Sequence, residues 1–339
     1  DRVFNILRRH ARLNSLIDES DCRRRVIADL CLSDGTSLQE FYILFSGIGY
    51  SPSALAANEI KLLTKLKDTR IENITFPQQI NAELPLWIAK KLSLKWGANF
   101  LTEAIALNQP ASLDLRVNTL KGNCTRALKV LQKDQIEAQE TSLSPIGLRI
   151  KNRVNLQAST ALKGGFVEIQ DEGSQLISLL VETKADMKTI DLCAGGGGKT
   201  LALGAIMRDG GPLIACDTDA DRLKKLKPRL RRSGISNVTR HQLTGDNDPW
   251  YAENAITAER ILVDVPCTGS GAWRRTPAQK WRLTEERLEE LIATQQIIMT
   301  KAVDLLAPSG RLIYATCSVL PDENENQIQW FLNQHPEFK

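Results

Sequence analysis

The sequence predicts an α/β protein whose second half forms a parallel sheet covered by helices on both faces. Two observations predict that half: strand-like and helix-like runs alternate beyond Ser174, and a glycine-rich turn follows the first of these strands. A third observation concerns the first half, where helical spacing continues to about Leu107 and gives way to a short mixed region. We therefore expect a helical N-terminal region at 1–110, a small α+β insert at 111–172 and an α/β domain at 173–339.

The N-terminal region is predicted to be helical because its apolar residues recur at three- and four-residue intervals. One helix carries Leu38, Phe41, Tyr42 and Leu44, a second carries Ile60, Leu63 and Leu66, and a third carries Leu101, Ile105 and Leu107 and ends before Pro110. In the insert we expect strands at 113–118, 147–150 and 165–169 and a helix at 125–132.

The parallel sheet is predicted to contain five strands, at 189–192, 213–217, 238–242, 260–264 and 311–315. The helix before the last strand has the clearest apolar face, which consists of Leu288, Leu291, Ile292, Ile298, Met299, Ala302 and Leu305. Pro308 and Gly310 are expected to end that helix.

Composition excludes several classes of protein. The 339 residues contain 42% hydrophobic and 25% charged residues, and no apolar run approaches the ~18 residues of a membrane span. The first seven residues lack the features of a secretory signal. Seven scattered cysteines and three histidines show no zinc-site or dithiol spacing. We expect a monomeric cytoplasmic protein without a membrane segment, a metal site or an obligate protein partner.

The charge of the chain is mildly basic and locally clustered. The net charge is +4 and the pI is near 8.6, which alone would not identify a nucleic-acid partner. Clusters occur at Arg23–Arg25, at Lys224–Arg232 and at Arg274–Arg275, after Trp273. Contact with a phosphate backbone and a solvated helix face are both compatible with the first two.

A glycine-rich loop follows the first predicted strand of the sheet. It comprises Cys193, Ala194, Gly195, Gly196, Gly197, Gly198 and Lys199, between Asp191-Leu and Thr200. Glycines let a backbone approach a ligand closely, and the N-terminus of the following helix presents unpaired amides. A triphosphate-binding loop would need glycine where Cys193 stands, and a dinucleotide-binding loop would need a third glycine where Leu201 or Thr200 stands. The loop therefore favours S-adenosyl-L-methionine, which has no phosphate.

Acidic residues follow the next two strands. Asp217 stands at the end of the second strand, where a carboxylate can accept hydrogen bonds from both ribose hydroxyls. Asp246 lies beyond the third strand, where it can contact the adenine amino group, although an ordinary loop aspartate explains Asp246 equally well.

Two cysteines follow the last two strands, in Asp264-Val-Pro-Cys267 and in Tyr314-Ala-Thr-Cys317. Ligands of open parallel sheets bind at the carboxyl ends of the strands, so both thiols and the glycine loop are expected to meet in one crevice. Carbon 5 of cytosine is too electron-poor to attack a methyl sulfonium, but a thiolate added to carbon 6 makes it nucleophilic. A second thiol can assist release of the product, and Asp264 can hold the base or cap the turn.

In these motifs the sequence resembles the family of the bacterial ribosomal RNA cytosine-5 methyltransferase RsmB and its Nop/Sun-type relatives. The resemblance extends from about Leu113 to the end, over Leu115-Arg-Val-Asn-Thr-Leu120, Gln170-Asp-Glu-Gly-Ser-Gln175, the loop 191–200, Asp264–Cys267, Arg274–Pro277 and Tyr314–Asn324. It implies a class I S-adenosylmethionine-dependent methyltransferase, that is, a Rossmann-like parallel sheet.

The resemblance also implies roles for individual residues. Cys317 would be the nucleophile, and Cys267 would assist product release. The loop Cys193–Lys199 together with Asp217, Asp246 and Asp264 would line the cofactor and base site. The insert would contact RNA, and the N-terminal helices are compatible with the bacterial branch and with RNA binding.

Two departures from the family pattern stand out. The family usually has Ala and Pro at the positions of Gly195 and Gly196, which predicts a more flexible loop. The family also closes its sheet with a further antiparallel hairpin, which is not expected before the chain stops at Lys339.

Competing interpretations make distinguishable predictions. A DNA cytosine-5 methyltransferase would use the Pro-Cys267 thiol as nucleophile, but the Glu-Asn-Val segment of that class does not follow here. A catalytically silent RNA-binding assembly factor would not need both thiols, and a nicotinamide dehydrogenase would bind NAD. Ribosomal RNA is the first expected substrate and transfer RNA the second.

Overall fold

The computed structural model describes residues 2–17, 21–152 and 154–338, so Asp1 and Lys339, the ends of the predicted domains, lie outside it. The chain forms two compact units. One contains residues 1–110, 269–284 and 319–321, and the other contains 111–268, 285–318 and 322–339. The insert and the parallel sheet share the second unit, whereas their division into separate domains stays a prediction.

The first unit is helical. Its helices are α1 (Arg2–Arg8), α2 (His10–Asn14), α3 (Cys22–Asp29), α4 (Leu38–Leu44), α5 (Ala57–Leu66), α6 (Gln78–Asn81), α7 (Leu86–Trp96), α8 (Phe100–Asn108) and α15 (Ala278–Arg282), with single turns η1 (Leu30–Asp34), η2 (Ile71–Asn73), η3 (Gly97–Asn99) and η5 (Ser270–Ala272). Its core includes Leu13, Ile27 and Phe41. The predicted helix at Leu38–Leu44 is confirmed, but only Phe41 is buried in it.

The insert is a four-stranded antiparallel sheet with the order β2-β3-β1-β4. Its elements are β1 (Leu113–Val117), α9 (Cys124–Lys133), β2 (Ala138–Glu140), β3 (Gly147–Ile150), η4 (Leu156–Ala158), α10 (Thr160–Lys163) and β4 (Val167–Ile169). Strand β2 was not predicted, because its three residues carry no alternating apolar pattern.

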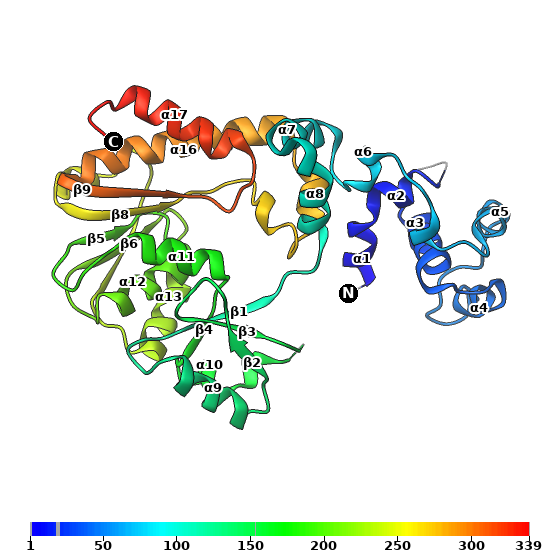
Figure 1. Ribbon diagram of the computed structural model, residues 1–339, viewed down its shortest axis with the longest axis horizontal. Coiled ribbons are helices and arrows are strands. Elements are labelled where there is room, and N and C mark those ends of the chain that lie inside the picture. Colours follow the sequence, from blue (N-terminus) through cyan, green and yellow to red (C-terminus); the bar gives the residue numbers. More distant parts are fainter. Residues whose placement is uncertain (1, 18–20, 153, 339) are drawn as a thin grey trace. The chain divides into compact units, whose positions relative to one another are not determined.

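The larger sheet has five parallel strands in the order β7-β6-β5-β8-β9, which confirms the predicted fold class. Its elements are α11 (Glu172–Leu180), β5 (Thr189–Asp191), α12 (Gly198–Ile206), β6 (Leu213–Asp217), α13 (Ala220–Ser233), β7 (Val238–Gln242), α14 (Trp250–Glu253), β8 (Ala258–Asp264), α16 (Glu285–Leu305), β9 (Leu306–Ala315), η6 (Pro321–Glu323) and α17 (Glu325–Gln334). Helices α16 and α17 cover one face, and α11, α12 and α13 cover the other (Figure 1).

The two faces of this sheet have different cores. Ile190, Ile261 and Val263 pack with Met299 of α16 and other residues on one face. Leu201, Ala215 and Leu226 form part of the core on the other. Helix α16 ends at Leu305, before Pro308, and Pro308 with Gly310 lies in β9 instead. An edge strand tolerates a proline because one side of it has no hydrogen-bonded neighbour. No helix in the described ranges is long and apolar enough to cross a membrane.

Candidate active site

The predicted site residues follow the carboxyl ends of four neighbouring strands. The glycine loop follows β5, Asp217 ends β6, Asp264 ends β8, and Cys317 lies two residues after the end of β9. The strand register pairs Asp191 with Ala215 and Asp264 with Ala315, so these ends lie at one edge of the sheet. The structure therefore brings the loop and both cysteine-bearing turns to one edge of the sheet, as expected for parallel strands.

The two thiols are in direct contact. The Sγ atoms of Cys267 and Cys317 are 3.4 Å apart. This contact with Cys267 lowers the pKa of Cys317, and the nearby charge of Lys199 acts in the same direction, while burial and Asp264 oppose it. The net shift is downward, which increases the thiolate fraction of Cys317 at neutral pH.

A buried carboxylate supports the turn that carries Cys267. Glu323 is fully buried and accepts hydrogen bonds from Thr268 N at 2.8 Å and from Thr268 Oγ1 at 2.5 Å. Gln295 of α16 donates to Pro266 O at 2.9 Å and to Glu323 Oε1 at 3.0 Å. Because a buried carboxylate needs such donors, Glu323 holds the backbone after Cys267, while Gln295, which it binds, holds Pro266 O before Cys267.

The turn that carries Cys317 is held from the same segment. Asn324 Oδ1 accepts a hydrogen bond from Thr316 Oγ1 at 2.7 Å, and Asn324 Nδ2 donates to Ser318 O at 3.0 Å. Sequence reasoning assigned no role to Glu323 or Asn324. The signal was present, because both residues end the Tyr314–Asn324 motif on which the family resemblance depends.

Lys199 and Asp264 form an ion pair beside the thiols. Lys199 Nζ lies 2.5 Å from Asp264 Oδ2. The side chain of Lys199 is 13% exposed and that of Asp264 is 32% exposed, so the pair is only partly screened by water. Both charges are near enough to Cys317 to act on its pKa, Lys199 lowering it and Asp264 raising it.

The glycine loop is tied to Asp217. Gly195 N donates to Asp217 Oδ2 at 2.7 Å, and Asp217 Oδ1 accepts from Asp219 N at 2.8 Å. A carboxylate has about four acceptor positions, so two bonds leave capacity for ribose hydroxyls. Gly195 has a φ of +54°, and a Cβ added to it would meet no atom within 4 Å. This open space beside an acidic group fits a nucleoside cofactor approaching the backbone.

Hydrogen bonds hold the start of the loop and the end of the strand before it. Ala194 N donates to Cys216 O at 2.8 Å, and Asp191 accepts a hydrogen bond from Thr200 Oγ1 at 2.6 Å. Burial raises the pKa of Asp191 to about 7 and raises the pKa of Cys193 well above its ordinary value. The raised pKa disfavours the thiolate form of Cys193.

Asp246 lies apart from these contacts. It lines a cavity of about 660 Å³ together with Asp248, Tyr251 and Lys301, among others. Asp248 holds the segment that contains Asp246 by accepting hydrogen bonds from Thr244 N and Trp250 N. In the part of the chain that the structure describes, no hydrogen bond or ion pair joins Asp246 to the glycine loop. Its contact with adenine stays a prediction.

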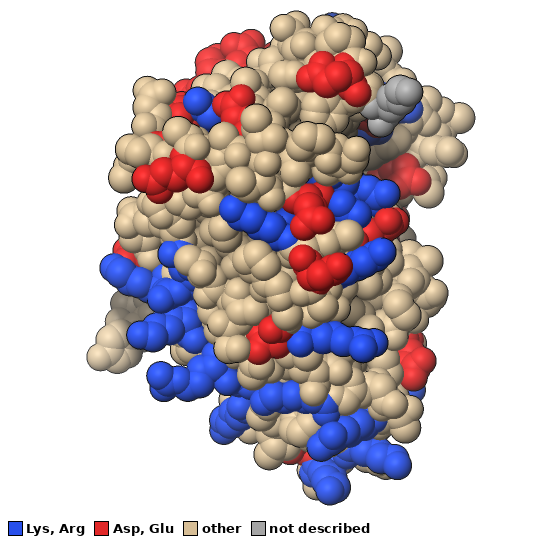
Figure 2. Space-filling view, turned by 90° about the vertical axis from the view of Figure 1, so that its left-hand side faces the viewer, with Lys and Arg blue, Asp and Glu red and all other residues tan. Residues whose placement is uncertain are grey.

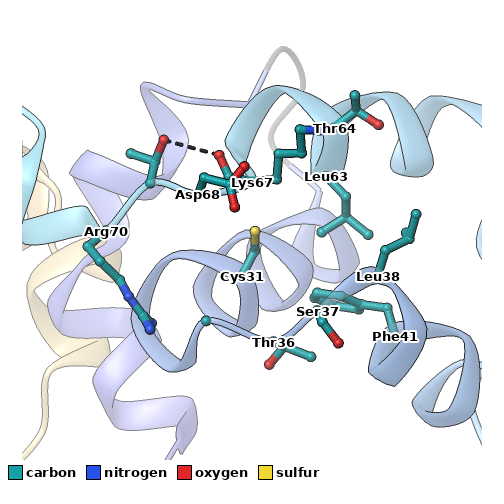
Figure 3. A pocket seen from close by; sticks show the side chains of 12 residues that line it. Cys31, Thr36, Ser37, Leu38, Phe41, Leu63, Thr64, Lys67, Asp68 and Arg70 are labelled. Atoms are coloured by element: carbon teal, nitrogen blue, oxygen red, sulfur yellow. Dashed lines mark hydrogen bonds between the residues drawn. The ribbon is translucent and has the colours of Figure 1, made fainter.

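The helical unit contains a separate cavity of about 430 Å³. Figure 3 shows the Cys31 sulfur near its centre, with Arg70 on one side and Leu63 and Phe41 on the other. None of the twelve residues that line it belongs to the predicted site. Two of the basic clusters also have structural contacts in this unit, because Arg23 pairs with Glu59 and Arg274 donates to Pro110 O.

The parallel sheet, with a glycine loop after β5 and an acidic group at the end of β6, has the fold of S-adenosylmethionine-dependent methyltransferases. Two family models match the chain: "16S rRNA methyltransferase RsmB/F" over residues 178–339, and the RsmF/B-like ferredoxin-like domain over residues 84–157. The chain belongs to this RsmB/F methyltransferase family.

Individual relatives support the same family. The chain is 31% identical over 274 residues to a probable ribosomal RNA small subunit methyltransferase B of Synechocystis, covering 79% of this chain and 60% of that protein. It is 33% identical over 257 residues to ribosomal RNA small subunit methyltransferase B of Photorhabdus laumondii, covering 75% and 59%. The chain thus spans about three fifths of these relatives. The crystal structure of PH0851 is similar, with a TM-score of 0.82, 28% identity and coverage of 99% and 80%.

Proposed function

We propose that this protein transfers a methyl group from S-adenosylmethionine to carbon 5 of cytosine in RNA, and that small-subunit ribosomal RNA is its substrate. The observation that carries the proposal is the pair of thiols 3.4 Å apart at the strand ends that also hold the glycine loop. The names of the two curated relatives, both small-subunit ribosomal RNA methyltransferases, support the choice of RNA. The reducing cytoplasm suits a protein whose seven cysteines are thiols.

Cys317 is the nucleophile in this proposal. Its thiolate, favoured by the lowered pKa, forms a bond to carbon 6 of cytosine, and the ring electrons move to carbon 5. S-adenosylmethionine, when bound, supplies an electrophilic methyl group for that carbon. The Lys199–Asp264 pair lies beside the reacting ring, where it can hold the polar edge of the base and stabilise charge in the adduct.

Cys267 completes the cycle in this proposal. After methylation, carbon 5 must lose its proton, and the bond between carbon 6 and Cys317 Sγ must break with the electron pair returning to the sulfur. Cys267 in its thiolate form can accept the carbon 5 proton and become a thiol, and its sulfur lies 3.4 Å from the Cys317 sulfur that leaves carbon 6. Glu323 holds the turn of Cys267 and thereby fixes this geometry.

The glycine loop and Asp217 are the proposed cofactor-binding residues. The open space at Gly195 admits the methionine part, and the remaining acceptor positions of Asp217 suit ribose hydroxyls. The rest of the proposed cofactor site is lined by Cys193, Ala194 and Gly196–Lys199. Asp246 is the proposed adenine contact.

The insert and α13 are the proposed RNA-contacting surface. Exposed basic residues occur on α9 (Arg126, Lys129 and Lys133) and on α13 (Lys224, Lys225, Lys227 and Arg231). Figure 2 shows Lys and Arg gathered over the lower part of one face, which holds the insert, while Asp and Glu are more frequent above. Such a surface attracts a phosphate backbone and makes binding dependent on salt.

The proposal is tested with the purified protein, S-adenosylmethionine carrying a labelled methyl group, and either small-subunit ribosomal RNA or transfer RNA. We expect label in ribosomal RNA, and bisulfite sequencing should then identify 5-methylcytosine. Label in transfer RNA alone would show that transfer RNA, and not ribosomal RNA, is the substrate. Tight S-adenosylmethionine binding without label in either RNA would instead support the silent assembly factor and contradict the proposal.

A further inference from the structure

Two sequence motifs of the insert have no part in the reaction described above, yet they contact the cofactor loop. Arg116 belongs to the motif Leu115–Leu120 and lies on β1. Gln170 begins the motif Gln170–Gln175, directly after β4. Arg116 Nη1 donates to Gln170 Oε1 at 2.5 Å and to Gly198 O at 2.7 Å. Gly198 is the last glycine of the loop and the first residue of α12. The insert therefore holds one end of the loop directly.

This arginine is buried at a cost. Arg116 is only 2% exposed, and burial lowers its pKa to about 10. Its buried Nε atom has no hydrogen-bond partner in the described structure. Arginine is rarely buried unless it is paired, because desolvating a guanidinium is unfavourable. An apolar side chain would fill the core beneath the sheet better than an arginine. The burial of Arg116 is therefore best explained by its hydrogen bond to Gly198 O.

A second contact reaches the loop from the same sheet through α13. Glu168 of β4 is 3% exposed and accepts a hydrogen bond from Arg229 Nη2 at 3.0 Å. The other guanidinium nitrogen of Arg229 donates to Gly196 O. Arg232 also pairs with Glu168. The buried carboxylate thus orients Arg229 toward the middle of the loop.

The loop needs external support because it has little of its own. Four consecutive glycines supply no side chains, and glycine loses more conformational freedom on ordering than any other residue. The positive φ values of Gly195 and Gly197, +54° and +81°, select one conformation among many accessible ones. Donors fixed by buried partners, Arg116 on β1 and Arg229 on α13, can hold that conformation before the ligand arrives.

We propose that Arg116, and Glu168 acting through Arg229, are positioning residues that pre-form the cofactor loop by holding Gly198 O and Gly196 O, so that the affinity for S-adenosylmethionine depends on the insert. This inference rests on the proposed use of the loop for S-adenosylmethionine. It also gives the Arg116 and Gln170 motifs a role that is independent of RNA contact.

The test compares two arginine deletions in one sheet. Arg116→Met removes the contact with Gly198 O, whereas Arg149→Met removes a guanidinium of β3 that pairs with Asp114 at 2.7 Å. Isothermal titration with S-adenosylmethionine alone should show at least tenfold weaker binding for Arg116→Met and less than twofold change for Arg149→Met. In methylation assays the KM for S-adenosylmethionine should rise while the KM for RNA stays constant. Arg116→Lys should recover part of the affinity.

Two further variants keep the test decisive if Arg116→Met does not fold. Glu168→Gln and Arg229→Met act at the second contact and should each weaken S-adenosylmethionine binding about threefold or more. Unchanged affinity in the folded variants, or an equal loss in Arg149→Met, would overturn the inference even if RNA is methylated. Weakened binding together with a wild-type protein that methylates no RNA would leave the inference standing and remove the proposed function.

Discussion

Cys317 and Cys216 are the same kind of residue on the same sheet, yet their surroundings give them opposite properties. Cys317 lies beyond the end of β9 beside a second thiol and Lys199, and its pKa is lowered. Cys216 lies inside β6, where burial raises its pKa far above the ordinary value. The comparison teaches that burial and neighbouring groups, rather than residue type, decide whether the pKa of a cysteine is raised or lowered.

The largest effect is expected for Cys317→Ala. Because Cys317 forms the bond to carbon 6 in the proposed reaction, its removal should reduce methyl transfer by roughly a thousandfold or more. Labelled methyl incorporation into RNA measures the loss. Cys124→Ala, a thiol of α9 in the insert, is the matched control and should keep nearly full activity. Equal activity of both variants would remove Cys317 from the chemistry.

A smaller effect is expected for Lys199→Met. Lys199 lowers the pKa of Cys317, so its loss should raise that pKa. The acidic limb of the kcat/KM profile should then move to higher pH, with about tenfold lower activity at pH 7 for a shift of one unit. Activity should recover partly as the pH rises. An acidic limb that stays in place would contradict the assigned electrostatic role.

How much of this could be predicted from the sequence differs between regions. Both thiols, the glycine loop and Asp217 were predicted because each follows a recognisable strand, and parallel strands end at one edge. Glu323, Gln295 and the Arg116 contact were not, because they depend on which distant segments pack together. Strand β2 was missed for lack of a pattern, and the exposure of Tyr42 could not follow from spacing alone.

The buried carboxyl group of Asp191, at the end of β5, predicts a pH effect on stability. Burial raises the pKa of Asp191 to about 7, above its ordinary value of 3.8. The folded state therefore favours the protonated carboxyl, so this contribution to stability is complete below about pH 4 and is lost as the pH rises through about 7. Asp191→Asn should flatten the pH dependence of the unfolding free energy in this window. Denaturant titrations at several pH values measure it, and an unchanged slope would contradict the prediction.

The smallest effect is expected for Cys216→Ala. Loss of the buried sulfur leaves a small cavity and should cost about 1 kcal/mol of unfolding free energy. Methylation per folded molecule should stay unchanged, because the thiol takes no part in the reaction. Urea denaturation and activity at a temperature well below the transition test both halves. A large loss of activity with normal stability would break the distinction between the two cysteines.

The roles of the two strand-end thiols can be separated directly in a denaturing gel. Cys267→Ala should let the RNA adduct at Cys317 accumulate as a slowly migrating band, because addition proceeds while release is impaired. The double variant Cys267→Ala/Cys317→Ala should show no such band. A band that survives loss of Cys317, or that appears in Cys317→Ala alone, would assign the nucleophile to Cys267 and contradict the proposed chemistry.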